Sequence, residues 1–130
     1  MKGYDVKFIL NYDYPITPNS FNNAKSILNW LFDENFNAVL IDDDIDYQVE
    51  DVSNLERNDI EEIIDSFFNF TFDNIINVPL YKFLVLNNNE KTMILANINS
   101  LIFDYASIND FYGLFDGTDK PYPENDLNSH

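Results

Sequence analysis

The chain has 130 residues and a formal net charge of −16, from 23 acidic and 7 basic residues. This length fits one domain, and the 45% share of hydrophobic residues supplies its core. The charge argues against binding to nucleic acid or anionic membranes, because both depend on Lys and Arg. The sequence has no cysteine, signal-peptide pattern or membrane-spanning run, so we expect a cytoplasmic protein without disulfides.

The first half of the chain alternates between strand and helix patterns. Alternating apolar residues predict a strand over Val6–Tyr12, and a helical period predicts a helix from 19–20 to about Asp33. A short apolar run predicts a second strand over Phe36–Ile41. The acidic segment Asp42–Asp44 is interpreted as a solvated turn before a third strand, Asp46–Val52.

The second half repeats this alternation. Asn58 and Glu61 resemble a capping box at the start of an amphipathic helix. Two strands, Leu80–Leu86 and Thr92–Ile98, are joined by a short Asn-rich connection that predicts a hairpin. The second of them is apolar on both faces and is expected in the centre of the sheet. A last helix is predicted from Ser107, capped with Asp110, to Gly117.

The order of these elements is strand, helix, two strands, helix, two strands, helix. It predicts an α/β chain of the α+β type, with a mixed β-sheet and about three helices packed on it. Residues 1–117 form this domain. Residues 118–130 are polar and without periodicity, and we interpret them as a tail or linker.

Several kinds of active site are excluded by the residues present. The single histidine, His130, ends the polar tail, so no positioned imidazole base is expected. The three glycines are scattered and form no phosphate loop. A calcium loop beginning at Asp42 would need Gly and Glu where the chain has Tyr47 and Ser53, and zinc lacks ligands. We therefore expect no metal site.

The segment Asn99–Tyr105, at the junction between a buried strand and the last helix, carries the most informative pattern. It resembles the His-His-x-x-x-Asp-Gly motif of nonribosomal peptide synthetase condensation domains. In this register Asn99 and Ser100 replace the two histidines, Asp104 retains the aspartate and Tyr105 replaces the glycine. Further segments resemble the family in the expected order: Asp51-Val52-Ser53, Phe70-Thr71-Phe72-Asp73 and Pro79-Leu80-Tyr81-Lys82-Phe83.

The resemblance implies one N-terminal lobe of a chloramphenicol acetyltransferase-like fold with a degenerate motif. The parent reaction forms an amide between aminoacyl or peptidyl groups that phosphopantetheine tethers to carrier proteins. The implied partners are a second condensation lobe, carrier domains and adenylation domains, with phosphopantetheine on the carrier and no cofactor bound directly. The implied catalytic positions are Asn99, Ser100 and Asp104. Because serine cannot replace imidazole as a base near neutral pH, we expect the isolated chain to be inactive.

Two alternatives remain open at this point. The chain is a non-catalytic acidic module that binds other proteins through its surface and an exposed sheet edge, or it is an unrelated small α/β domain with a chance likeness. The Arg-rich segment of the family is replaced here by 31–37, and Asp104 also fits an ordinary capping residue.

Overall fold

The computed structural model describes residues 3–16 and 18–116. Its main sheet has four strands in the order β1-β6-β5-β4. β6 is antiparallel to both of its neighbours, and β4 runs parallel to β5, so the sheet is mixed as predicted. The strands of this sheet are β1 (Asp5–Tyr12), β4 (Gln48–Asp51), β5 (Tyr81–Asn87) and β6 (Thr92–Asn99).

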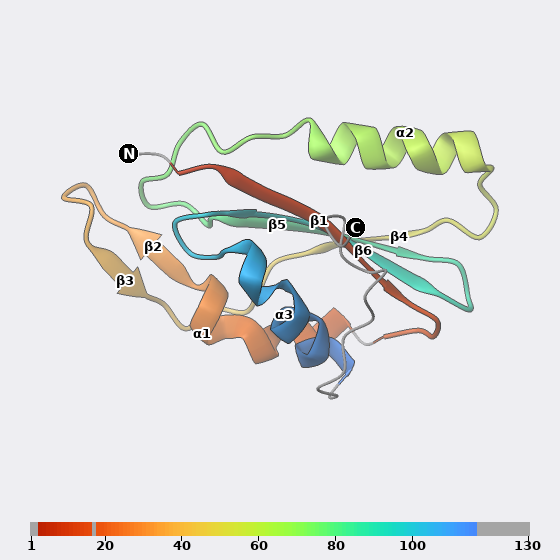
Figure 1. Cartoon of the computed structure of the whole chain (residues 1–130), viewed down its shortest axis with the longest axis horizontal. Helices are drawn as coiled ribbons and strands as arrows, with labels where there is room; N and C mark the ends of the chain where they lie inside the picture. The colour runs from red at the N-terminus through yellow and green to blue at the C-terminus, as the bar shows by residue number, and fades with distance from the viewer. Residues whose placement is uncertain (1–2, 17, 117–130) are drawn as a thin grey trace.

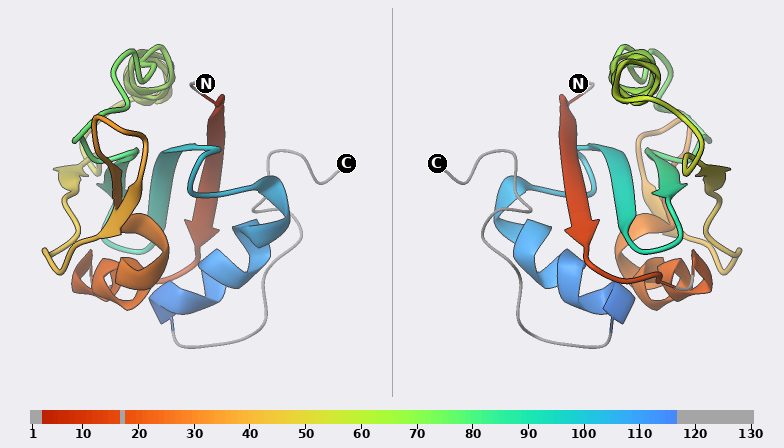
Figure 2. Two further views of the ribbon diagram at one scale, coloured as in Figure 1. Left: turned by 90° about the vertical axis from the view of Figure 1, so that its left-hand side faces the viewer. Right: turned by 90° about the vertical axis from the view of Figure 1, so that its right-hand side faces the viewer.

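Helices cover both faces of this sheet, as Figures 1 and 2 show. One face packs against α2 (Arg57–Phe68), and the other against η1 (Pro18–Ala24), α1 (Lys25–Leu28) and α3 (Ile108–Asp116). A short 3-10 helix, η2 (Tyr105–Ser107), leads into α3. Because β6 lies between two other strands under both layers, almost all of its side chains are buried.

The face opposite α2 is held by an aromatic core. Phe111 of α3 contacts four other phenylalanine rings, with centroids 4.9 to 6.0 Å apart. Stacked and edge-to-face pairs of this kind add to the stability gained by burying the rings. The rings that meet Phe111 are those of Phe8, Phe83, Phe103 and Phe115.

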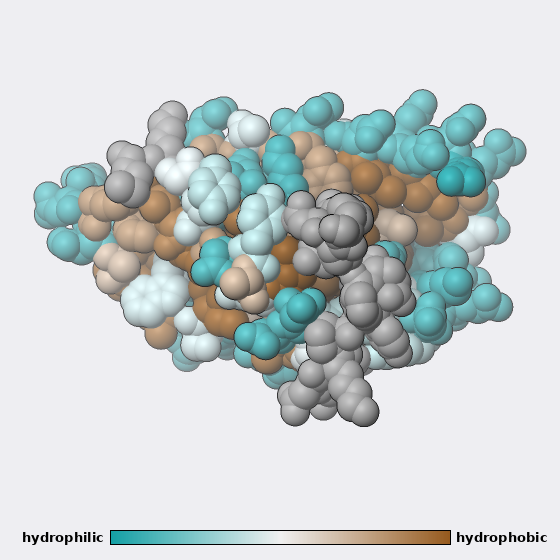
Figure 3. Space-filling model, in the orientation of Figure 1, coloured by the Kyte–Doolittle hydropathy of each residue, from teal (hydrophilic) through white to brown (hydrophobic). Residues whose placement is uncertain are grey.

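Helix α2 buries one side and exposes the other. Its inner residues pack on the sheet around Phe67, while hydrophilic side chains follow its outer side, above a hydrophobic band next to the sheet (Figure 3). The observed N-cap, Glu56, lies two residues before the predicted cap, Asn58. The backbone N–H of Glu56 donates to Asp59 Oδ2 at 3.4 Å, so the capping box predicted for Asn58 and Glu61 was wrong.

The long helix predicted from 19–20 to Asp33 was also wrong. The segment forms only η1 and α1 and then enters β2 (Trp30–Phe32), which pairs with β3 (Ala38–Leu40) in a separate two-stranded sheet. Asparagine side chains compete with helical hydrogen bonding. Asn22 Oδ1 accepts from the backbone N–H of Ile45 at 2.9 Å, and Asn29 Nδ2 donates to the Asp43 carbonyl at 2.6 Å.

The hairpin of β5 and β6 is confirmed. Asn88 shapes its connection, because Asn88 Oδ1 accepts hydrogen bonds from the backbone N–H groups of Glu90 and Lys91. Asn89 adopts a φ of 75°, a conformation that asparagine tolerates better than most residues. The predicted helix end at Gly117, the domain boundary there and the polar tail 118–130 lie outside the described residues.

Candidate functional site

Asn99 and Ser100 lie where β6 ends, next to the start of β1. Asn99 is 1% exposed, and its side chain donates to Asp5 Oδ1 at 3.4 Å and accepts from the backbone N–H of Leu101 at 2.9 Å. Ser100 Oγ accepts from the backbone N–H of Tyr4 at 2.8 Å. The backbone N–H of Ser100 also donates to the Tyr4 carbonyl at 2.6 Å. The Asn99 side chain therefore holds the motif loop against the first residue of β1, and the Ser100 side chain holds it against the residue before β1.

Gly3 makes this close approach possible. Its φ is 66°, in the left-handed region that favours glycine. A Cβ atom at this position would lie 2.7 Å from both Asn99 Oδ1 and Ser100 Oγ, and 3.1 Å from Leu101 Cγ. Gly3, Tyr4 and Asp5, here called the N-terminal strap, therefore fit directly over the first two motif positions. The sequence did not predict this contact, because no local pattern links positions so distant in the chain.

The remaining motif positions build the turn into α3. Phe103 is 5% exposed and stacks on Phe8 with centroids 5.6 Å apart. Asp104 caps η2, since its Oδ1 accepts from the backbone N–H and the hydroxyl of Ser107 at 3.1 and 3.2 Å. The predicted cap formed by Ser107 and Asp110 was wrong, because Ser107 lies inside η2 and donates to Asp104. Asp104 makes no ion pair with any described residue.

Residues 31–37, compared above with an Arg-rich segment of the resembling family, form the end of β2 and the tip of the β2–β3 hairpin. Asp33 Oδ1 accepts hydrogen bonds from the backbone N–H groups of Asn35 and Asn37, both at 2.9 Å. A hollow of about 280 Å³ separates this hairpin from the motif loop, with Trp30, Phe32, Ala38, Leu101 and Ile102 around it. Every one of these lining side chains is apolar, so the hollow offers no side-chain group for proton transfer.

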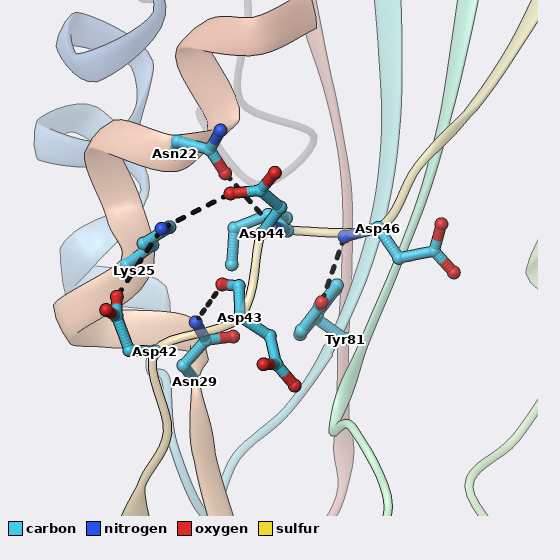
Figure 4. Close-up of polar contacts among 9 residues, drawn as sticks. Asn22, Lys25, Asn29, Asp42, Asp43, Asp44, Asp46 and Tyr81 are labelled. Carbon is cyan, nitrogen blue, oxygen red and sulfur yellow. Dashed lines mark hydrogen bonds and ion pairs between the residues drawn. The ribbon is translucent and has the colours of Figure 1, made fainter.

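The acidic segment after β3 is anchored to the neighbouring helices and sheet (Figure 4). Lys25 Nζ lies 3.5 Å from Asp42 Oδ1 and 3.3 Å from Asp44 Oδ1. The hydrogen bond to Asp44 is the main cause that raises the pKa of Lys25. The backbone N–H of Asp46 donates to the Tyr81 hydroxyl at 3.0 Å. The segment forms no turn or bend, so the predicted turn was wrong, whereas Asp42, Asp43 and Asp44 are exposed to solvent as predicted.

Neither a metal centre nor a membrane span is found in the part of the chain that the structure describes. Within residues 3–16 and 18–116, no three His, Cys, Asp or Glu side chains are grouped so that they could hold a metal ion. No helix in these ranges is long and apolar enough to cross a membrane.

No protein-family model and no curated protein matches the sequence significantly. Solved structures do match the fold. VibH, described as a nonribosomal peptide synthetase condensation enzyme, matches 94% of this chain with a TM-score of 0.64 and 13% identity, over 32% of its own length. A variant of the starter condensation domain of the rhizomide synthetase RzmA matches 92% of this chain with a TM-score of 0.65 and 16% identity, over 34% of its length.

A third match extends the likeness to an epimerization domain. This domain, from the third module of tyrocidine synthetase B, matches 88% of the chain with a TM-score of 0.63 and 15% identity. The chain spans at most about a third of the length of these three structures, and 13% of a longer synthetase structure. The chain therefore has the fold of one lobe of a nonribosomal peptide synthetase condensation domain, as the sequence predicts.

Proposed function

We propose that the chain serves as the N-terminal lobe of a condensation-type domain and is not catalytic by itself. In the parent reaction, an acceptor amine attacks a donor thioester carbonyl. The C–N bond of the amide forms, the C–S bond breaks, and the amine's proton leaves as the carrier's thiol is released. The observation that carries the proposal is the position of Ser100, whose hydroxyl oxygen is bonded to the N-terminal strap.

The parent reaction requires removal of a proton from the attacking amine, and imidazole suits this task near neutral pH. A serine hydroxyl does not, because it is a poor base. Any contribution of Asn99, Ser100 and Asp104 to the rate would therefore come from holding the substrate and the loop in place by hydrogen bonds. The Ser100 hydroxyl can donate to a substrate oxygen while it accepts from Tyr4. Asn99 and Asp104 would keep the loop in shape through their bonds to Leu101 and Ser107.

We propose further that a second lobe, carrier domains and adenylation domains are its partners, with phosphopantetheine carried by the carrier domain. The share of the structural neighbours that the chain spans, about a third, supports the need for a second lobe. Two substrates react fast only when both are held in a near-attack geometry. One lobe presents one wall of such a site.

An amide-formation assay tests this proposal. The isolated chain is mixed with an aminoacyl-pantetheine thioester and an amino acid amide, and the product is quantified by mass spectrometry. The wild type, Ser100→Ala and Asp104→Asn should all match the rate in buffer, as should the control Asp110→Asn, which changes an exposed carboxylate of α3. A wild-type rate above buffer that falls in Ser100→Ala would contradict the proposal.

A second variant tests the need for another lobe. Ser100→His returns an imidazole to the position of the second motif histidine. The expected rate remains that of buffer, because one lobe does not hold both substrates. A clear increase with this single substitution would show that the isolated chain aligns the thioester and the amine alone. That result would overturn the proposed dependence on a second lobe.

A further inference from the structure

The sheet has a gap at the edge next to the start of β5. β5 pairs with β6 along its whole length, from Tyr81 to Asn87, whereas β4 pairs with it only from Leu84 onward. The first three residues of β5 therefore have a strand on one side only. The segment before β4 does not close the gap by ladder pairing, because Asp46 turns its backbone N–H to the Tyr81 hydroxyl at 3.0 Å.

The backbone at this gap is oriented for pairing. The N–H of Asn99 donates to the Leu80 carbonyl at 2.9 Å. In an antiparallel ladder, pairs that exchange hydrogen bonds alternate with pairs that do not. Lys82 is therefore the next residue of β5 to face β6, whereas the backbone N–H and C=O of Tyr81 and the N–H of Phe83 face the gap. An extended segment placed there would meet backbone donors and acceptors of β5, as in strand addition to a sheet edge.

A cavity of about 480 Å³ opens at the same place. Its walls come from the segment before β4, the loop after α2 and the first residues of β5. Phe70 is 38% exposed, and its ring contacts the Phe72 ring, with centroids 5.1 Å apart, and the Lys82 ammonium, 4.2 Å from its centroid. A cavity of this size suits a large apolar side chain. The apolar and aromatic side chains that line it are Tyr47, Phe70, Phe72, Val78, Pro79, Tyr81 and Phe83.

Two of the three charged side chains that line the cavity are acidic, Asp46 and Asp73 against Lys82, and this balance favours a basic occupant. Asp46 and Asp73 line it and are exposed, and neither forms an ion pair with a described residue. The carboxylate of Asp46 points away from the pairs that Lys25 makes (Figure 4). The net charge of −16 attracts cations to the whole molecule. The lining residues include none of the motif positions 99–105, so this surface is separate from the motif loop.

We propose that this gap binds an extended peptide segment of a partner protein, in which lysine or arginine residues flank one aromatic or aliphatic anchor. The peptide backbone pairs with Tyr81 and Phe83, and the anchor fills the aromatic cavity beside Phe70. The basic residues lie next to Asp46 and Asp73. This inference stands apart from the proposed condensation role, because it uses other residues and a separate assay.

Fluorescence anisotropy with synthetic peptides tests the proposal on the full chain. The probe is a fluorescein-labelled peptide in which lysine and phenylalanine alternate. Two comparison peptides replace lysine with glutamate, or carry N-methyl groups on alternate backbone amides. We expect saturable binding of the first peptide that weakens as salt rises, and at least about tenfold weaker binding of both comparison peptides. Equal binding of either comparison peptide, or no binding of the first, would overturn the proposal.

Variants of the protein locate the binding. Phe70→Ala should weaken binding about tenfold, because an anchor in an aromatic cavity carries much of the affinity. Phe36→Ala is the matched control, since Phe36 is 40% exposed, also contacts one neighbouring ring and lies on the β2–β3 hairpin away from the cavity. Asp73→Asn should weaken binding and reduce its salt dependence, whereas Asp110→Asn should change neither. Equal losses in Phe70→Ala and Phe36→Ala would contradict the assigned site.

Amide chemical shifts give a readout that does not depend on any variant folding. On addition of the lysine–phenylalanine peptide, the amide signals of Tyr81 and Phe83 should shift, together with those of Phe70–Asn74. The amides of β1 should change little, because β1 lies at the opposite edge of the sheet. Shifts centred on the motif loop 99–105, with none at Tyr81 and Phe83, would overturn the assignment.

Discussion

Tyr4 and Ser100 exchange two hydrogen bonds across 96 positions of sequence, one through the serine hydroxyl (2.8 Å) and one through the serine backbone N–H (2.6 Å). In the register that the sequence resemblance implies, Ser100 takes the place of the second motif histidine. The side chain at this position therefore joins the N-terminal strap to the end of β6. These two bonds give Ser100 a structural role that can be measured as a change in the free energy of unfolding.

Replacing Ser100 with alanine removes the acceptor of the Tyr4 N–H. We expect Ser100→Ala to lower the free energy of unfolding by about 1 kcal/mol, the usual value for one hydrogen bond. Urea denaturation followed by circular dichroism measures this change. Ser66→Ala is the control, since Ser66 is exposed on α2, and it should shift the unfolding free energy by less than about 0.5 kcal/mol. Equal effects of the two substitutions would contradict the structural role of Ser100.

Gly3→Ala tests the close approach of the strap. The new Cβ would lie 2.7 Å from Asn99 Oδ1 and Ser100 Oγ, on a backbone with a φ of 66°. Strain of this kind costs about 1–3 kcal/mol, and we expect a loss of that size in urea denaturation. Gly113→Ala is the control. Gly113 lies inside α3, where alanine is the better helix former, so this substitution should raise the free energy of unfolding or leave it unchanged. An unchanged unfolding free energy in Gly3→Ala would show that the strap is loose.

Phe111→Ala tests the aromatic core. Phe111 is 1% exposed, and its removal takes away one ring of the five-ring cluster and leaves a cavity. Losses of this type amount to about 3–5 kcal/mol. Phe111→Leu keeps much of the volume and should cost clearly less. Phe36→Ala, at an exposed ring, should cost the least of the three. A loss in Phe111→Ala no larger than that in Phe36→Ala would place the core elsewhere.

The Lys25 ion pairs predict a specific pH dependence. The pKa of Lys25 is raised above its ordinary value of 10.5, chiefly by its hydrogen bond to Asp44. Because the pKa is raised in the folded state, the stability that the Lys25 ion pairs contribute is fully present below pH 10.5. It is lost as the pH rises through the folded-state pKa. Lys25→Gln should therefore lower the urea midpoint at pH 7, and the difference from wild type should shrink above pH 10.5. Because the pairs are exposed, the effect should be small and reduced by salt.

The comparison with wild type and with a control variant separates the titration of Lys25 from that of other groups at alkaline pH. Burial raises the pKa of Tyr81, so ionisation of Tyr81 lowers the stability of wild type and Lys25→Gln alike above pH 10. The difference between the two proteins therefore reports Lys25. Lys91→Gln, at an exposed lysine without an ion pair to any described residue, is the control and should follow the wild type at every pH. A Lys25→Gln difference that grows with pH would contradict a raised Lys25 pKa.

Local periodicity was sufficient to predict the elements that form most of the sheet. β1, β5, β6 and their hairpin carry alternating or continuous apolar runs with clear turn residues, and the structure confirms them within one or two residues. The amphipathic pattern of α2 was equally clear. Elements whose conformation depends on distant partners were not predictable. η1 and α1 end early because Asn22 and Asn29 bond to the segment 43–45, which no helical period records.

The place of the segment 99–105 in the fold was predicted from the sequence, but its contacts were not. The motif register placed Asn99 and Asp104 at the junction of β6 and the last helix, where the structure has them. The N-terminal strap was missed. One signal for it was present in the sequence: Gly3 is one of only three glycines and lies shortly before the first strand. The aromatic cavity was missed as well, since its walls come from three separate segments.

Hydrogen exchange at the Tyr4 amide, in wild type and Ser100→Ala, is the most direct measurement of the structural role assigned to the motif position. Tyr4 is 58% exposed as a residue, and its backbone N–H donates to Ser100 Oγ, so we expect this bond to protect the amide. We predict a protected amide in wild type and an exchange rate about fivefold or more faster in Ser100→Ala, as expected when a bond worth about 1 kcal/mol is lost. An amide that exchanges equally fast in both proteins would contradict this role.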